Sequence, residues 1–304
     1  MYLVAGATGH TGSVVARTLL EQGEQVRVVL RDAAQAAPWR QRGAEVVLAE
    51  LGDVRAMTEA LRGMEGAYLL LPEPEPSSIG VLEERWRVVD ALAQAVKASG
   101  VPHFVALSSV GAQHAEGTGL VKTKHTLERE LGLLGVAVTF LRAAYFMENW
   151  SPWLPTVVHE GVLPSFLGPT DRRVHMVATR DVGQIAARML REPAISQRVV
   201  ELTGPVDYSP KEVADTLARL LGRPVHVEEH TPASMVPMLE DLGYSAELAH
   251  LMAELVESLN RVQLTFEHPG RALRGWTTLD EVLGGLLRAL NALPSRPQGT
   301  LGAP

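Results

Sequence analysis

The first twelve residues, MYLVAGATGHTG, place a short apolar run directly before three glycines at a spacing of three, Gly6, Gly9 and Gly12. An apolar run that ends in glycine is typical of a buried strand followed by a tight turn. Residues 14–20 then carry apolar side chains at helical spacing, and Gly23 ends the segment. The chain therefore begins with a strand, a glycine turn and a helix.

The same alternation continues along the chain. The expected strands are almost entirely apolar, as in a parallel sheet that is covered on both faces. Strands that alternate with helices predict right-handed crossovers, and we expect an α/β fold of Rossmann type, a doubly wound parallel sheet with a smaller, mostly helical C-terminal region. The strands expected after the first are 25–30, 44–49, 66–71, 103–108, 136–141 and 198–204.

Three helices have detailed signals. In residues 81–98, apolar side chains at steps of three and four predict one buried stripe. Residues 179–190 predict a helix with Asp181 as N-cap. Residues 209–222 predict a helix with Ser209 as cap, Pro210 at the first position and Glu212 at the third. The stripe in 81–98 consists of Leu82, Trp86, Val89, Ala93 and Val96.

The glycine turn predicts an anion site. A helix N-terminus offers unpaired N–H groups and the positive end of the helix dipole, and glycines let a pyrophosphate approach the backbone closely. The G-x-x-G-x-x-G spacing is weak alone and stronger at a first strand–helix turn; a glycine-rich connector without a ligand is the alternative. We expect dinucleotide contacts from the whole turn, namely Gly6, Thr8, Gly9, His10, Thr11 and Gly12. For His10 a surface histidine at a helix start is the alternative.

The residue after the second strand discriminates between cofactors. An acid there binds the ribose 2′-hydroxyl of NAD, whereas an arginine pairs with the 2′-phosphate of NADP. Arg31 follows the strand, 19 positions after Gly12, and Asp32 follows Arg31. We expect NADP(H) to be preferred over NAD(H), with a solvated surface charge as the alternative for Arg31.

Charge and composition narrow the class of protein. The net charge of -7 disfavours direct binding to nucleic acid, and the chain has no cysteine for disulfides or thiolate metal sites. We find no signal peptide and no apolar stretch long enough to span a bilayer, so we expect a cytoplasmic protein without membrane contact. The histidines are scattered, and His226 and His230 fall in an expected strand, so no metal site is predicted.

The predicted domain boundary lies near residue 150, where the regular alternation of strands and helices ends. We expect residues 1–150 to form an NAD(P)-binding Rossmann domain. Residues 151–292 are expected to form a smaller substrate or partner region interleaved with it. The last residues, 293–304, are rich in proline, glycine and polar residues and are expected to be a disordered tail.

Four segments carry a family resemblance. GATGHTG, VVLRD (28–32), LSSVGA (107–112) and TFLRAAYFMEN (139–149) resemble the NmrA-like branch of the atypical short-chain dehydrogenases/reductases. The resemblance covers residues 1 to about 190 and continues more loosely to 225. The branch contains NADPH-dependent quinone reductases and NADPH-sensing regulators without known turnover. The resemblance therefore implies one of these two functions.

The resemblance also indicates which catalytic group is missing. Catalytic members of the wider superfamily use a tyrosine, a lysine four residues later and a serine at the end of the fifth strand. The lysine corresponds to Lys124, but the tyrosine corresponds to Leu120. We expect Lys124 to hold the nicotinamide ribose. The alternative is that its side chain snorkels, with the charged end in solvent. We assign no catalytic residue. Ser108, or its neighbour Ser109, either contacts the ligand or bonds its own backbone.

Two functions fit these features. The first is an NADPH-dependent oxidoreductase that transfers hydride directly to a quinone-like acceptor, which needs less acid catalysis than an ordinary carbonyl. The alternative is a non-catalytic NADP(H)-sensing regulator that binds a protein partner. Tyr145, Phe146 and Asn149 follow the sixth strand and are expected either to line a flat substrate pocket or to pack the junction with the second region. A homodimer is compatible with both functions.

Overall fold

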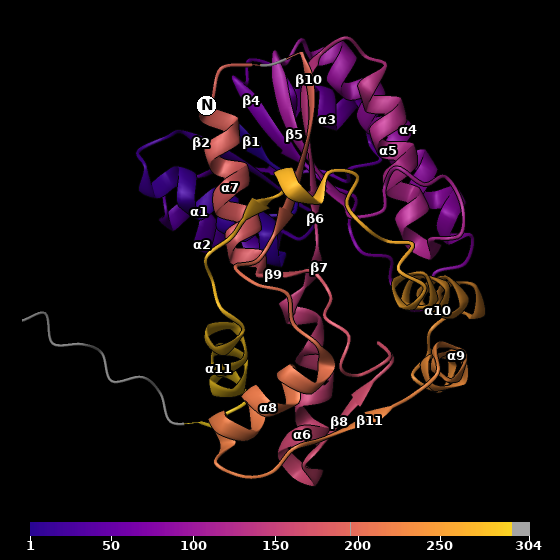
Figure 1. Cartoon of the computed structure of the whole chain (residues 1–304). Helices are drawn as coiled ribbons and strands as arrows, with labels where there is room; N and C mark the ends of the chain where they lie inside the picture. Colours follow the sequence, from indigo (N-terminus) through magenta and orange to yellow (C-terminus); the bar gives the residue numbers. More distant parts are fainter. Residues whose placement is uncertain (195, 294–304) are drawn as a thin grey trace, which may run out of the picture.

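The computed structural model describes residues 1–194 and 196–293, and the tail expected at 293–304 lies outside these residues except for its first position. Eight parallel strands form one sheet in the order β12-β10-β6-β5-β4-β1-β2-β3 (Figure 1). This confirms the predicted fold class. The strands are β1 (Tyr2–Val4), β2 (Val26–Leu30), β3 (Glu45–Leu48), β4 (Gly66–Leu69), β5 (His103–Ser109), β6 (Ala137–Ala143), β10 (Gln197–Thr203) and β12 (Leu273–Arg274).

The central strands β1 and β4 are buried on both sides because helices cover both faces of the sheet. On one face α1, α2 and α7 pack against side chains such as Val4 and Val28, and on the other α3, α4 and α5 pack against Leu3 and Phe104. Complete burial of such a side chain contributes about 1.5–3 kcal/mol. The helices of the sheet are α1 (His10–Glu21), α2 (Ala36–Gln41), α3 (Val54–Leu61), α4 (Val81–Ser99), α5 (Lys122–Gly132) and α7 (Thr179–Arg191).

The strand order fixes where a ligand can bind. Strand β1 pairs with β2 on one side and with β4 on the other, so the chain leaves β1 and β4 in opposite directions along the sheet. Such a reversal opens a crevice at the carboxyl ends of the strands. The glycine turn follows β1 at this crevice.

A second region, below the sheet in Figure 1, has its own apolar core. It is reached through β7 (Tyr145–Phe146) and the 3₁₀ segment η3 (Met147–Trp153), and β7 pairs with β9 (Met176–Val177). Its other elements are α6 (Leu154–Glu160), β8 (Val162–Ser165), α8 (Pro210–Leu221), β11 (His226–Glu229), α9 (Pro232–Asp241), α10 (Ala246–Asn260) and α11 (Leu279–Ala289).

Helix α8 confirms its sequence signals and α7 corrects one. Ser209 and Glu212 form a capping box at the start of α8. Helix α7 begins at Thr179, so Asp181 lies inside its first turn and the N-cap assignment was wrong. The buried Asp181 carboxylate instead accepts hydrogen bonds from the amides of Trp276 and Thr277, at 2.8 and 2.9 Å. A partner almost one hundred residues away outweighs the local capping preference.

The stripe predicted for 81–98 is also only partly correct. Val89 and Val96 are buried in α4, but Trp86 is 41% exposed and Arg85 is buried in its place. The Arg85 guanidinium donates to the carbonyl of Pro72 and, at 3.3 Å, to the hydroxyl of Thr123. Specific hydrogen bonds therefore place a cation where apolar periodicity alone predicted none.

Helices α1 and α7 approach closely at Gly183. A Cβ atom at Gly183 would lie 2.5 Å from Cβ of Val14 and 2.8 Å from the carbonyl oxygen of Thr11. Both atoms belong to α1, which carries the glycine turn. The two helices can therefore pack at this distance only without a side chain at Gly183.

We predict that Gly183→Ala lowers the free energy of unfolding by about 1–3 kcal/mol, because the new methyl forces the two helices apart. Gly285→Ala is the matched control, since it is also helical and a Cβ there meets nothing within 4 Å. The control should be neutral or stabilising by up to about 1 kcal/mol. Urea unfolding measures both, and equal effects of the two substitutions would contradict the packing argument.

Candidate dinucleotide site at the carboxyl edge of the sheet

The turn between β1 and α1 is built for close backbone approach. Gly6 has φ +65°, and its carbonyl accepts the amide of Gly9 at 2.9 Å. A Cβ at Gly12 would lie 2.3 Å from the same carbonyl oxygen, and a Cβ at Gly6 would lie 2.8 Å from the side chain of Leu70. The fold itself therefore requires glycine at positions 6 and 12.

Gly9 differs from its two neighbours. Its backbone is extended, with φ -88° and ψ 178°, and a Cβ would meet only the Gly6 carbonyl oxygen, at 3.4 Å. Gly9 is the N-cap of α1, and within this described helix no side chain caps the first turn and no acidic residue lies there. The exposed start of α1 thus presents amide groups and the positive end of its dipole, a setting that suits a phosphate.

The other residues of the turn have different surroundings. Thr8 and His10 are exposed, whereas Thr11 is buried and its hydroxyl accepts a hydrogen bond from Tyr68 at 2.9 Å. Burial raises the pKa of Tyr68 well above its ordinary value, so this phenol stays protonated. The Tyr68–Thr11 contact joins β4 to α1 across the crevice, and it makes Thr11 a structural member of the turn.

Glu148 is a residue that the sequence reasoning did not select. Its carboxylate accepts hydrogen bonds from the amide of Thr179, at 3.0 and 3.1 Å, and from the Thr179 hydroxyl at 2.7 Å. Burial raises the pKa of Glu148, and the Thr179 hydrogen bonds and the charge of His10 oppose this rise. Glu148 therefore occupies the N-terminus of α7 next to the start of α1.

Arg31 lies at the carboxyl end of β2, where the sequence predicted it. Its guanidinium is 3.7 Å from the carboxylate of Glu75, and both side chains are exposed. The neighbouring Asp32 caps the following 3₁₀ turn, because its carboxylate accepts the amide of Ala34 at 2.8 Å. Asp32 thus bonds the backbone of its own turn, whereas the Arg31 side chain contacts a distant segment.

Lys124 stands in the first turns of α5 and is partly buried. Burial and the charge of the nearby Arg85 together lower its pKa to about 8, and the charge of Glu73 partly opposes this shift. Two cations are thus held close together at the carboxyl edge of the sheet. The sequence identified Lys124, whereas Arg85 was not among the residues that it selected.

Leu120 precedes α5 in the 3₁₀ turn η2 (Gly119–Val121). It packs against an apolar cluster that includes Val81, Leu248 and Leu251, and so it lies beneath α10. The contact is tight, since a Cβ at Gly119 would be 2.0 Å from the carbonyl oxygen of Leu251. Leu120, which the resemblance aligned with the superfamily tyrosine, is therefore an apolar packing residue.

Ser108 is directed into a buried charge cluster. Its hydroxyl donates to Glu128 at 2.6 Å, and Glu128 receives two hydrogen bonds from Arg142, at 2.8 and 2.6 Å. Arg142 also pairs with Glu267, and its strand neighbour Glu201 accepts the amide of Glu267 at 2.6 Å. Ser109 donates to the carbonyl of Val110. Both serine hydroxyls thus have protein partners.

The three residues expected to form an aromatic pocket are not all brought together. Tyr145 and Asn149 share a hydrogen bond, and Tyr145 contacts Trp150 edge-on at 6.3 Å. Phe146 packs instead with the core of the α1 and α7 face, while Tyr145 packs with the core of the second region. Successive residues of a strand point to opposite sides, so β7 separates the two rings.

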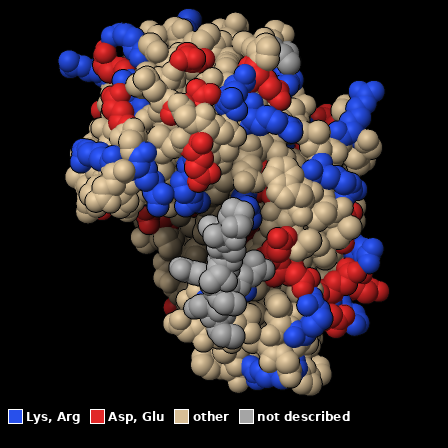
Figure 2. All heavy atoms as spheres, turned by 90° about the vertical axis from the view of Figure 1, so that its left-hand side faces the viewer, with Lys and Arg blue, Asp and Glu red and all other residues tan. Residues whose placement is uncertain are grey.

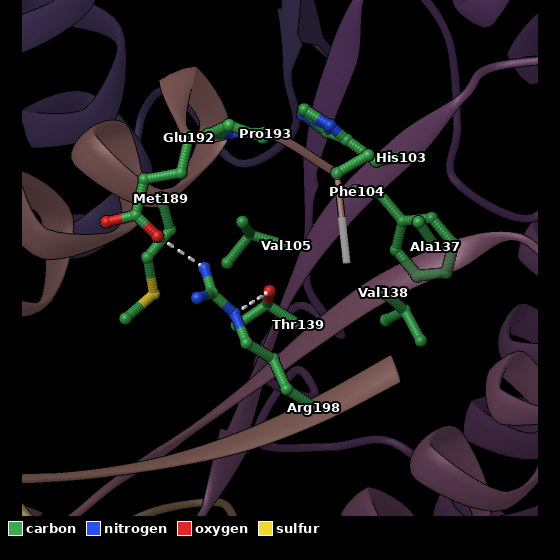
Figure 3. A pocket seen from close by; sticks show the side chains of 11 residues that line it. His103, Phe104, Val105, Ala137, Val138, Thr139, Met189, Glu192, Pro193 and Arg198 are labelled. Carbon is green, nitrogen blue, oxygen red and sulfur yellow. Dashed lines mark hydrogen bonds and ion pairs between the residues drawn. The ribbon is translucent and has the colours of Figure 1, made fainter. Parts of the chain in front are cut away.

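A pocket does occur at the opposite edge of the sheet (Figure 3). It lies at the amino ends of β5, β6 and β10, where Arg198 donates to Thr139 at 2.8 Å and pairs with Glu192 at 2.7 Å. Because the strands are parallel, these amino ends are remote from the glycine turn. The pocket is therefore separate from the candidate dinucleotide site.

The surface, the helices and the titratable side chains add three observations. Lys and Arg are interspersed with Asp and Glu over the face shown in Figure 2. No helix in the described part of the chain is long and apolar enough to cross a membrane. Among residues 1–194 and 196–293, no group of three or more His, Asp or Glu side chains is arranged to hold a metal ion.

Known proteins resemble this chain over most of its length. The NAD(P)H azoreductase of Xenophilus azovorans is 28% identical over 84% of this chain and 86% of its own. A (4-alkanoyl-5-oxo-2,5-dihydrofuran-3-yl)methyl phosphate reductase of Streptomyces griseus is 34% identical over 91% and 96%. The crystal structure of the NADPH-dependent quinone oxidoreductase QOR2 of Escherichia coli with NADPH has a TM-score of 0.80 at 26% identity, covering 94% of this chain and all of that one.

The glycine turn, the strand order and these similarities agree with the match of a family model. The model of the NmrA-like family matches residues 2–283, nearly the whole chain. The resemblance predicted from the four sequence segments is thereby confirmed, and the protein belongs to the NmrA-like family.

Proposed function

We propose that the protein is an NAD(P)H-dependent oxidoreductase that prefers NADPH and transfers hydride to a conjugated, electron-poor acceptor such as a quinone. The observation that carries the proposal is Gly9. The fold needs glycine at positions 6 and 12 but tolerates a Cβ at position 9. A glycine that the fold does not need, at the uncapped start of a helix, is explained by a pyrophosphate that must approach the backbone there.

The cofactor preference is supported by the surroundings of Arg31. A guanidinium at the end of β2 can form a charge-assisted pair with a 2′-phosphate. Asp32, which would otherwise favour the unphosphorylated ribose, has its carboxylate committed to the amide of Ala34. The E. coli quinone oxidoreductase of similar structure is described as NADPH-dependent, whereas the azoreductase is named for NAD(P)H without distinction.

Lys124 is the proposed ligand of the nicotinamide ribose. Its ammonium group is partly buried beside Arg85, which opposes its charged form. A cation in such a position is costly to the fold, and functional sites are where such groups gather. Hydroxyl groups of a bound ribose would give this ammonium the acceptors that it needs.

The class of acceptor follows from the missing acid. Leu120 cannot donate a proton, and burial raises the pKa of Tyr145 to about 12 while Asn149 holds its hydroxyl. NADPH supplies the hydride when it is bound. An electron-poor conjugated acceptor takes this hydride readily and can obtain its proton from water. The azo compound, the oxo-dihydrofuran and the quinone named for the three similar proteins share this conjugated character.

A non-catalytic NADP(H)-sensing regulator is the second candidate, and Leu120 is the observation that favours it. The two candidates differ in turnover. Oxidation of NADPH, followed at steady state with a panel of quinones and azo dyes, supports the oxidoreductase. Tight NADPH binding without oxidation by any of these acceptors supports the regulator.

We predict that Gly9→Ala weakens NADPH binding at least about tenfold, because a methyl group occupies the space of the pyrophosphate. The thermal midpoint should stay nearly unchanged, since the Cβ meets only one atom at 3.4 Å. Isothermal titration calorimetry measures the affinity, and Gly285→Ala serves as the control remote from the turn. Unchanged affinity in Gly9→Ala would remove the main support for a dinucleotide at this turn.

We predict that Lys124→Met raises the free energy of unfolding at pH 7 by about 1 kcal/mol while it weakens NADPH binding at least about fivefold. The folded pKa is about 8 and that of an unfolded lysine is about 10.4. Between these values the unfolded chain binds more protons, so the stability of the native protein rises with pH, and the variant lacks this rise. Urea unfolding from pH 7 to 10 and calorimetry test both parts, and unchanged NADPH affinity would assign Lys124 to packing alone.

A further inference from the structure

The ion pair between Arg31 and Glu75 joins two segments at the carboxyl edge of the sheet. Arg31 follows β2, and Glu75 lies in the loop between β4 and α4, at a nitrogen–oxygen distance of 3.7 Å. The side chains are 59% and 69% exposed. An exposed pair at this distance is weak, so Arg31 can exchange Glu75 for a stronger anion.

The loop that carries Glu75 is held in place on both sides of this residue. The carbonyl of Pro72 accepts a hydrogen bond from buried Arg85, and the carbonyl of Pro76 accepts the amide of Ser245 at 2.8 Å. Glu75 is also flanked by Pro74 and Pro76, whose rings fix the backbone angle φ. The backbone that carries Glu75 is therefore kept near Arg31 by the fold and not only by the attraction between the two side chains.

The start of α4 is braced in the same way. The amides of Val81 and Leu82 donate to the carboxylate of Glu247 on α10, at 3.0 and 3.4 Å. The loop between β4 and α4 is thus tied to α10 at Pro76 and again just after its end. This bracing means that Glu75 remains close when a ligand engages Arg31.

We propose that Glu75 is a specificity-determining residue for the 2′ position of the adenosine ribose. Its carboxylate competes with a 2′-phosphate for Arg31 and accepts a hydrogen bond from the 2′-hydroxyl of an unphosphorylated ribose. Arg31 favours NADPH and Glu75 moderates that preference, a role that Asp32 does not fill because it caps its own turn. The inference rests on the proposed dinucleotide function.

Charge repulsion determines the sign and the size of the effect of Glu75 on nucleotide affinity. A 2′-phosphate carries close to two negative charges at neutral pH, so a carboxylate beside the same guanidinium repels it and weakens its binding. For exposed groups the effect is modest and is screened by salt. Removal of the charge should therefore tighten NADPH binding and weaken NADH binding, most clearly at low ionic strength.

The experiment measures the dissociation constants of NADPH and NADH by calorimetry for the wild type, Glu75→Gln, Arg31→Ala and the double variant, in 20 and 300 mM NaCl. We expect Glu75→Gln to tighten NADPH binding about 3- to 30-fold at low salt and to loosen NADH binding. In the Arg31→Ala background the gain for NADPH should be smaller, because competition for the guanidinium is gone and only the direct repulsion of the phosphate remains. Glu21→Gln, an equal charge change at the far end of α1, is the control and should leave the preference unchanged.

Two results would overturn the proposal. If Glu75→Gln leaves the NADPH-to-NADH preference within twofold of the wild type while Arg31→Ala reduces it, Glu75 has no role and the proposed function stands. If the wild type binds neither nucleotide, the proposed function fails and the role of Glu75 fails with it. If Glu21→Gln tightens NADPH binding as much as Glu75→Gln does, the effect comes from the net charge of the protein, and the proposal is rejected as well.

Discussion

The structure depends on the close packing of backbone around the first turn of α1. At Gly12 a side chain would enter the carbonyl of Gly6, and at Gly183 it would enter Val14 of α1. These two glycines allow α1 to sit directly on β1 and α7 to sit directly on α1. Because interiors are close-packed, a methyl group added at either glycine would push α1 away and displace its N-terminus from the crevice between β1 and β4. The dinucleotide site that we propose is thus a consequence of how tightly this corner of the sheet packs.

A second constraint ties the C-terminal region to the same edge of the sheet. Arg142 lies on β6 between Ser108 of β5 and Glu201 of β10, in neighbouring strand positions. It binds Glu128 on α5 and Glu267 in the segment after α10. The pair with Glu128 is largely buried, whereas Glu267 is partly exposed. A buried ion pair adds little net stability, but loss of a partner is costly because it leaves the buried Arg142 charge unpaired. The cluster therefore fixes the position of the segment after α10 more than it strengthens the fold.

The proposed chemistry fits both the positive groups at the carboxyl edge of the sheet and the absence of an acid at position 120. The start of α1, Arg31 and Lys124 supply positive groups for a phosphorylated dinucleotide, whereas position 120 supplies an apolar contact with α10. Positioning of a hydride donor against an acceptor can by itself lower a barrier by several kcal/mol. A site of this composition suits an acceptor that needs orientation more than it needs an acid.

The amino-acid sequence by itself determined most strands of the sheet and the glycine turn between the first strand and the first helix. Strand positions, the α8 capping box and the glycine turn were predicted correctly, because each depends on residues within a few positions of one another. The tertiary structure alone decided that Arg85 is buried and Trp86 exposed, that Asp181 binds the amide of Trp276, that Glu148 reaches α7 and that Glu75 faces Arg31. In each of these cases a charged side chain found a partner far away in the chain, and no local pattern records such a partner. Apolar periodicity is a property of one segment, whereas the pairing of a buried or functional charge is a property of the assembled fold.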